Sequence, residues 1–136
     1  MTTRLSPYVC LPGTARQALE HYRSVFGGEV AISTFGEFGG GEGVDPDAVM
    51  HGQLDTPSGL TLMVSDAMAG MSAKTGGNVA LCLFGDDVPT AERFFAGLAE
   101  GGEVTTPLEK QVWGDLYGAL TDRFGVDWMV NVSPSA

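Results

Sequence analysis

A segment near the middle of this chain recurs near its end, and this repeat constrains the fold more than any other feature. Met50 to Val64 aligns without a gap on Leu116 to Val130, at a constant offset of 66 residues. Identical residues occupy five aligned positions, namely Gly52/Gly118, Leu54/Leu120, Gly59/Gly125, Met63/Met129 and Val64/Val130. Such internal identity at one spacing predicts two copies of a single supersecondary module.

Each copy has the pattern of two strands joined by a tight turn. In the second copy the turn spans residues 122–125, where Gly125 is free to adopt the positive φ that closes a hairpin. The strand that follows alternates, so that Trp128 lies on the apolar face and Met129 on the other. Gly-Gly-Glu-Val also occurs twice, at 27–30 and at 101–104, each time after a helical pattern. Both modules are therefore predicted as β-α-β-β-β.

The element boundaries follow from periodicity and from the residues that start and stop helices. In the first module we expect a helix from Thr14, as N-cap, to Phe26, and strands over Leu5–Leu11, Glu29–Phe38, Ala48–Leu54 and Leu60–Asp66. In the second module the first strand is expected over Asn78–Phe84, and Asp86-Asp87 at the start of the helix. By length the chain is one domain, 1–136, with module 1 at about 4–66, a connector at 67–77 and module 2 at about 78–133.

One helix covers only one face of its sheet, so the other face of each module needs a partner. We predict an α+β fold in which the two modules pair into an open, cup-shaped mixed sheet with the helices on the outer face. The alternation places the Leu, Val and Trp128 positions against the helices. The predicted cup lining is Ser6, Tyr8, Cys10, His51, Gln53, Thr61, Met63, Ser65, Asn78, Ala80, Cys82, Tyr117, Ala119, Asp127, Met129 and Asn131. This mixture of polar and soft apolar side chains is typical of small-molecule pockets, and a solvated sheet face is the alternative.

Composition excludes several classes of function. The net charge of −10 argues against nucleic acid and anionic membranes as partners, because the protein field repels phosphate. No apolar run approaches the roughly 20 residues of a membrane-spanning helix, and the N-terminus lacks the pattern of a signal peptide. Cys10 and Cys82 form no disulfide scaffold, and we expect buried thiols in a reducing, cytoplasmic setting.

Several segments, in order along nearly the whole chain, resemble one known family. They are Leu11-Pro12-Gly13-Thr14-Ala15, Ala18-Leu19 through Tyr22 to Val25-Phe26-Gly27-Gly28, Met50-His51-Gly52, Leu62-Met63-Val64-Ser65-Asp66, Pro107-Leu108, Trp113-Gly114, Thr121-Asp122-Arg123-Phe124-Gly125 and Trp128-Met129-Val130-Asn131-Val132. The chain resembles the vicinal oxygen chelate superfamily of glyoxalase I, extradiol dioxygenases and the fosfomycin and bleomycin resistance proteins. Within it, the chain looks like the PhnB-like subgroup. The resemblance implies the glyoxalase/bleomycin resistance/dihydroxybiphenyl dioxygenase fold and a homodimer.

The resemblance also implies where a metal would be held. Enzymes of this superfamily take ligands from the first and last strands of each module, and here those positions fall on Leu5 or Ser6, Met63, Asn78 and Met129. Two thioethers, an amide and a hydroxyl suit a hard divalent ion poorly. We therefore expect no metal cofactor. The subgroup is also labelled methyltransferase-like, but no strand leads through a glycine-rich loop into a helix that would hold a methyl donor.

Three functions are compatible with the sequence. The first is a metal-free binding protein whose cup holds a small molecule through Tyr8, His51, Gln53, Met63, Asn78, Trp113, Tyr117 and Met129. The second is a glyoxalase-like lyase or isomerase with His51 as general base. The third is a structural dimer with a vestigial pocket. The glycine-rich stretch Gly36–Ala48 is either a lid or a mobile loop.

Overall fold

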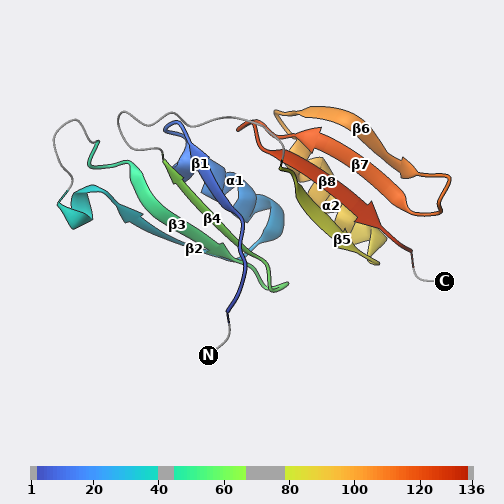
Figure 1. The fold of residues 1–136 in the computed structure, drawn as a ribbon, viewed down its shortest axis with the longest axis horizontal. Coiled ribbons are helices and arrows are strands. Elements are labelled where there is room, and N and C mark those ends of the chain that lie inside the picture. Colours follow the sequence, from blue (N-terminus) through green and yellow to red (C-terminus); the bar gives the residue numbers. More distant parts are fainter. Residues whose placement is uncertain (1–2, 40–44, 67–78, 135–136) are drawn as a thin grey trace. The chain divides into compact units, whose positions relative to one another are not determined.

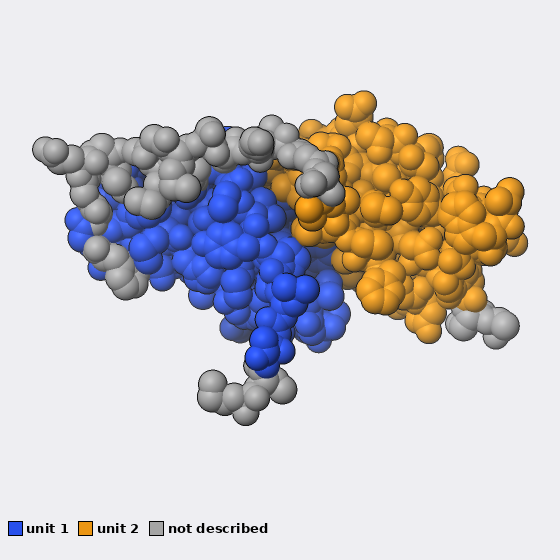
Figure 2. Space-filling model, viewed as in Figure 1, with its two compact units in different colours: residues 1–74 blue, residues 75–136 orange. Residues whose placement is uncertain are grey.

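The chain forms two compact units that repeat the same order of elements. The computed structural model describes residues 3–39, 45–66 and 79–134. The elements are β1 (Tyr8–Leu11), α1 (Ala15–Phe26), β2 (Glu29–Thr34), the 3₁₀ helix η1 (Gly36–Phe38), β3 (Val49–Asp55), β4 (Thr61–Asp66), β5 (Leu81–Gly85), α2 (Val88–Ala99), β6 (Glu103–Lys110), β7 (Leu116–Thr121) and β8 (Asp127–Val132) (Figure 1). The units comprise residues 1–74 and 75–136 (Figure 2). The predicted connector, 67–77, lies outside the described residues.

In the first unit, four strands form an open mixed sheet in the order β1-β4-β3-β2. Strand β1 runs parallel to β4, and the remaining pairs are antiparallel. Helix α1 lies on one face of this sheet (Figure 1). It buries Leu19 and Tyr22 completely, against a sheet face on which Leu54 and Val64 are also fully buried. Among the described residues of this unit, no α-helix other than α1 packs on the sheet.

The second unit repeats this arrangement with the order β5-β8-β7-β6 and a parallel β5–β8 pair. Helix α2 packs on one face of the sheet through Phe95 and Leu98. Trp128 is 4% exposed on β8, which confirms its predicted place on the helix side. The α+β fold with two βαβββ modules is thus confirmed, while the pairing of the modules into a cup stays a prediction. Neither described helix is long and apolar enough to cross a membrane.

The two hairpin turns are built alike. The N–H of Gly59 donates to the carbonyl of Thr56, and the N–H of Gly125 donates to the carbonyl of Asp122, both at 3.0 Å. Gly59 and Gly125 have φ values of +89° and +86°, a region that strains residues with a side chain. The repeated glycine of the sequence therefore closes the same turn in each module.

The other repeated glycines are required by close approach. A Cβ atom on Gly28 would collide with the carbonyl oxygen of Asp55, and one on Gly102 with that of Thr121. These two oxygens occupy aligned positions of the repeat. Each module thus brings the start of its second strand against the end of its third at the same point, and only glycine fits there.

Three strand ends differ from the prediction by three residues or more. Strand β5 begins at Leu81 and not at Asn78. The other two differences have a physical reason. Strand β1 begins at Tyr8 and not at Leu5, since Pro7 has no N–H to donate and only its carbonyl joins the ladder, to Met63 N at 3.1 Å. Strand β2 ends at Thr34 and not at Phe38. Its register with β3 shifts there, and the chain turns into η1.

The first turn of α1 is capped from a distant strand. Thr14 occupies the N-cap position as predicted, but its side chain caps nothing. Instead, Oδ1 of Asp66 accepts from the N–H of Ala15 at 2.9 Å, and Oδ2 accepts from the N–H of Val49, also at 2.9 Å. Asp66 is 7% exposed. One buried carboxylate at the end of β4 therefore fixes the starts of both α1 and β3.

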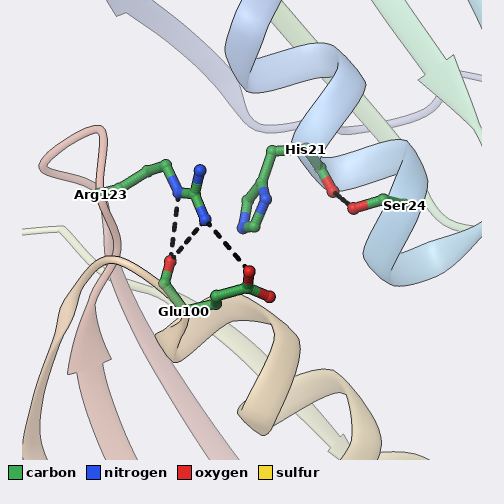
Figure 3. A network of polar contacts seen from close by, with 4 residues as sticks. All are labelled: His21, Ser24, Glu100 and Arg123. Atoms are coloured by element: carbon green, nitrogen blue, oxygen red, sulfur yellow. Dashed lines mark hydrogen bonds and ion pairs between the residues drawn. The ribbon is translucent and has the colours of Figure 1, made fainter.

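In the second unit the hairpin turn holds the end of α2. The Nε and Nη2 atoms of Arg123 donate to the carbonyl oxygen of Glu100 at 3.1 and 3.0 Å, and Nη2 lies 3.9 Å from its carboxylate (Figure 3). A guanidinium suits this place because the last carbonyls of a helix carry partial negative charge. At the N-terminus, Asp87 accepts from the N–H of Thr90 at 3.1 Å, as the acidic pair at 86–87 predicted.

Candidate functional site

The sheet face of the first unit that lies away from α1 carries four of the predicted ligand-binding residues. Tyr8 pairs with Met63 across β1 and β4, and Met63 pairs with Gln53 across β4 and β3. Register partners lie on the same face of a sheet, so these three side chains form one row. His51 lies two residues before Gln53 on β3 and therefore projects on the same face.

Two rings meet on this face. The ring centroids of Tyr8 and His51 are 5.8 Å apart and tilted by 34°. Tyr8 is 51% exposed, and His51 is half-buried. Side chains from three different strands thus place a phenol, an imidazole and the thioether of Met63 together. A flat organic molecule could stack on such a surface and form hydrogen bonds at its edge.

A hydrogen-bonded Thr–Asp pair lies at the hairpin end of this face. The second unit has the same pair with the two residue types exchanged between the strands. In the first unit the hydroxyl of Thr61 donates to Asp55 at 2.8 Å. In the second unit the hydroxyl of Thr121 donates to Asp127 at 2.7 Å. The aligned positions are 55 with 121 and 61 with 127, so the carboxylate and the hydroxyl have changed strands while the hydrogen bond has been kept.

The second unit carries the remaining described candidates. Met129 pairs with Cys82 and Ala119, and Tyr117 pairs with Asn131, all on the face opposite α2. Tyr117 occupies the position that aligns with His51. Trp113 lies in the turn between β6 and β7, and its ring packs edge-on against Tyr117 at a centroid distance of 6.3 Å.

The cysteines differ from expectation, since Cys10 and Cys82 are exposed and not buried. Both lie on the first strand of a module and on the face without a helix, which leaves them accessible within their units. Burial by neighbouring atoms nevertheless raises the pKa of Cys82. A raised pKa lowers the thiolate fraction at neutral pH, which argues against Cys82 as a nucleophile.

The donor set at the family's metal positions fits a hard divalent ion poorly. Met63 and Met129 occupy equivalent places on β4 and β8 and offer thioether sulfur. Ser6 uses its hydroxyl to donate to the carbonyl of Thr61 at 3.2 Å. Within residues 3–39, 45–66 and 79–134, no three His, Cys, Asp or Glu side chains gather in a way that could hold a metal ion.

The structure therefore groups the predicted site residues into two sets. Tyr8, His51, Gln53 and Met63 share a face in the first unit, and Trp113, Tyr117 and Met129 come together in the second. Asn78 lies outside the described residues, as does the 40–44 part of the predicted lid. Asp115 was not among the predicted site residues, and its carboxylate accepts from the amide of Asn131 at 3.0 Å. Its position just before the second copy of the repeat was the available signal.

Two four-stranded mixed sheets, each with one helix and each built from a βαβββ module, define a class of proteins with two such modules in tandem. The sequence profile of the Glyoxalase/Bleomycin resistance protein/Dioxygenase superfamily matches residues 4–130. The chain belongs to this superfamily.

Similar proteins agree with this assignment. Protein YjdN from Escherichia coli (strain K12) is 30% identical over 146 aligned positions, which cover 94% of each chain. The crystal structure of protein PA1353 from Pseudomonas aeruginosa superimposes with a TM-score of 0.86 at 35% identity, covering 98% of this chain and 100% of that one. The PhnB protein from Bacillus cereus shares the fold, with a TM-score of 0.78 at 23% identity over 96% of this chain and 99% of its own.

Proposed function

We propose that this protein binds a small organic molecule on the helix-free faces of its two sheets and requires no bound metal to do so. The observation that carries the proposal is the composition of those faces. Each presents an aromatic pair, Tyr8 with His51 and Trp113 with Tyr117, beside a methionine. Rings and thioethers supply broad, polarisable contact area, while Gln53 and Asn131 provide amides that orient a ligand.

A fragment screen tests the binding function. The full-length protein is screened by thermal shift against neutral, cationic and anionic aromatic fragments, and hits are titrated by NMR. We expect hits to shift resonances of β1, β3 and β4 or of β7 and β8. Tyr8→Ala and Met63→Ala should weaken hits of the first unit about two- to twelvefold, given about 0.5–1.5 kcal/mol for a lost ring or thioether contact. Gln17→Ala, on the exposed side of α1, is the matched control. Hits that bind equally well to all three variants would contradict the proposal for this face.

The absence of a required metal is tested by measuring the metal content of the purified protein. After expression in medium containing Zn²⁺, Mn²⁺ and Ni²⁺ and extensive dialysis, elemental analysis should find well under one equivalent of any divalent metal per chain. Thioethers at positions 63 and 129 bind such ions weakly, which is the reason for the expectation. About one equivalent of a divalent metal per chain would overturn it.

A catalytic version of the same site depends on His51. The contact between His51 and Tyr8 favours this second candidate, because the imidazole lies where a ligand stacked on Tyr8 would meet it. In a lyase or isomerase, His51 would remove a proton from the bound molecule. If His51→Ala keeps the affinity for every hit and no hit is converted by the wild-type protein, the enzyme hypothesis fails. If no fragment binds either face, the result would instead favour the third candidate, a structural dimer.

We also propose that the protein is a cytoplasmic homodimer in the form of one domain, with the two modules pairing into a cup. Family resemblance supports the dimer and the cup, and the sequence pattern supports the location. Sedimentation equilibrium should give twice the 14.2 kDa chain mass. A mass of one chain at micromolar concentration would refute the dimer.

A further inference from the structure

The turn between β6 and β7 presents an exposed aromatic side chain on a fixed backbone. The N–H of Gln111 donates to the carbonyl of Asp115 at 2.8 Å, and the N–H of Gly114 donates to the carbonyl of Gln111 at 3.0 Å. Gly114 has φ +99°, which a residue with a side chain would adopt only under strain. Trp113 is thereby held against Tyr117 while 59% of its surface remains exposed. Tryptophan is enriched among the residues that contribute most to binding energy in interfaces.

Carboxylates accompany this aromatic pair. Asp115 lies at the base of the turn, where Oδ2 accepts from the Asn131 amide at 3.0 Å. Glu109 is the register partner of Tyr117 on β6, so its side chain projects on the same face as the Tyr117 ring. Among the described residues, neither carboxylate forms an ion pair with a lysine or arginine.

The basic residues of the second unit are placed elsewhere. Arg93 lies over the ring of Phe94 on α2, and Arg123 is bound to Glu100. Lys110 pairs with Leu116 and so projects to the other face of the β6–β7 ladder from Glu109. Residues 75–136 contain no other lysine or arginine. The ring faces and carboxylates therefore create a local field that attracts cations and repels anions.

We infer that Trp113, Tyr117, Asp115 and Glu109 form a site for an organic cation, an amine or quaternary ammonium carried on an apolar body. This inference rests on the proposed function and names the ligand class for its second-unit face. An ammonium group over an indole or phenol ring is attracted by the ring quadrupole, and a nearby carboxylate adds Coulomb attraction. Methyl groups on the nitrogen would contact Trp113, and the apolar body would extend toward Met129 along the face.

The test compares two probes of the same shape that differ in charge. Choline and 3,3-dimethylbutan-1-ol are titrated separately into the full-length protein, and the indole N–H and Tyr117 amide resonances are followed by NMR. The chain has only two tryptophans, and Trp128 is buried, so it serves as an internal reference. We expect a saturable shift at Trp113 but not at Trp128, and about three- to thirtyfold tighter binding of choline than of the neutral alcohol. Raising the salt concentration should weaken choline binding.

Variants locate the site. Trp113→Ala and Asp115→Asn should each lower choline affinity by about three- to thirtyfold, as measured at the Tyr117 amide. Val112→Ala is the matched control, because Val112 is the fully exposed neighbour in the same turn. Asp115→Asn keeps the shape of the side chain, so it still tests the site if Trp113→Ala fails to fold.

The outcomes separate this inference from the proposed function. Equal affinity for choline and the neutral alcohol would overturn the cation site while leaving a small-molecule binding face in place. Unchanged choline affinity in Asp115→Asn and Trp113→Ala would overturn the inference as well. No binding of choline, together with fragment hits on either face, would again refute only the cation site. Failure of both the choline titration and the fragment screen would refute both.

Discussion

Asp66 offers the sharpest test of how this fold is held together. Its buried carboxylate accepts one hydrogen bond from the first turn of α1, at Ala15, and one from the first residue of β3, at Val49. These partners lie 51 and 17 residues away in the sequence. In Asp66→Asn the amide oxygen satisfies one N–H, but the amide NH₂ group then faces the other. In Asp66→Ala both backbone donors lose their partner.

The expected cost follows from the two bonds. A hydrogen bond to a charged group contributes about 1.5–3 kcal/mol, and a buried donor left unsatisfied costs about 1–3 kcal/mol. We therefore expect Asp66→Asn to lower the free energy of unfolding by about 2–4 kcal/mol and Asp66→Ala by about 3–5 kcal/mol. Domains of this kind have a total stability of about 5–15 kcal/mol, so either loss is a large fraction.

Urea unfolding followed by far-UV circular dichroism measures these differences. With an m-value of about 1.5 kcal/mol per molar urea, a loss of 3 kcal/mol moves the midpoint by about 2 M. Asp47→Asn is the control, because it makes the same chemical change at an exposed carboxylate and should cost less than about 0.5 kcal/mol. Hydrogen exchange at the Ala15 and Val49 amides should accelerate in Asp66→Asn. The reasoning is refuted if Asp66→Asn and Asp47→Asn have the same stability.

Three further predictions concern other parts of the chain. Gly102→Ala should lower the free energy of unfolding by about 1–3 kcal/mol, because its Cβ meets the carbonyl of Thr121. Gly59→Ala has open space around the added Cβ and should cost about 1–2 kcal/mol from its positive φ alone. A double variant whose urea midpoint shows no additive loss would contradict these separate causes. The hydroxyl and N–H of Thr90 hold the pKa of Asp87 below its ordinary 3.8, so its contribution to stability is complete above that pH and is lost as the pH falls through the lower, folded-state pKa. Acid unfolding curves should therefore differ between the wild type and Asp87→Asn mainly above this transition, and identical curves would contradict the lowered pKa of Asp87. Burial raises the pKa of Cys82, so its alkylation by iodoacetamide should reach half its maximal rate at a higher pH than a cysteine in a short peptide; a midpoint at or below the peptide value would disprove this.

Much of the fold was predictable because its strongest signals are local and occur twice. Hydrophobic alternation assigned Trp128 to the helix side, and glycine at 59 and 125 marked both hairpin turns. The ends of β1 and β2 were less predictable, since they depend on which N–H groups find a partner on the adjacent strand. Helix capping by Asp66 could not be predicted from the sequence for a similar reason. The carboxylate acts on N–H groups that are distant in the sequence, and no local pattern links them.

The candidate site was predictable only in part. Alternation identified the residues that share a face, such as Tyr8 with Met63, without giving the registers that make them neighbours. Glu109 was missed because the register of β6 with β7 shifts twice before it. After such shifts, counting alternate residues assigns side chains to the wrong face. Trp113 was expected to bind the ligand, and its position in a turn, with Asp115 beside it, comes only from the three-dimensional structure.

The reversed pair of Thr and Asp at the two hairpin ends records how the halves of this chain have diverged. After a duplication, neither position 55 nor position 61 needed to keep its residue type, provided that one strand supplied a hydroxyl and the other a carboxylate. The hydrogen bond is kept in both halves, although the residue types at the two positions are exchanged. Its reversal relocates one negative charge from β3 in the first half to β8 in the second, with no change in the number of charges. Two halves of common ancestry could thus come to favour different ligand groups while keeping the same backbone.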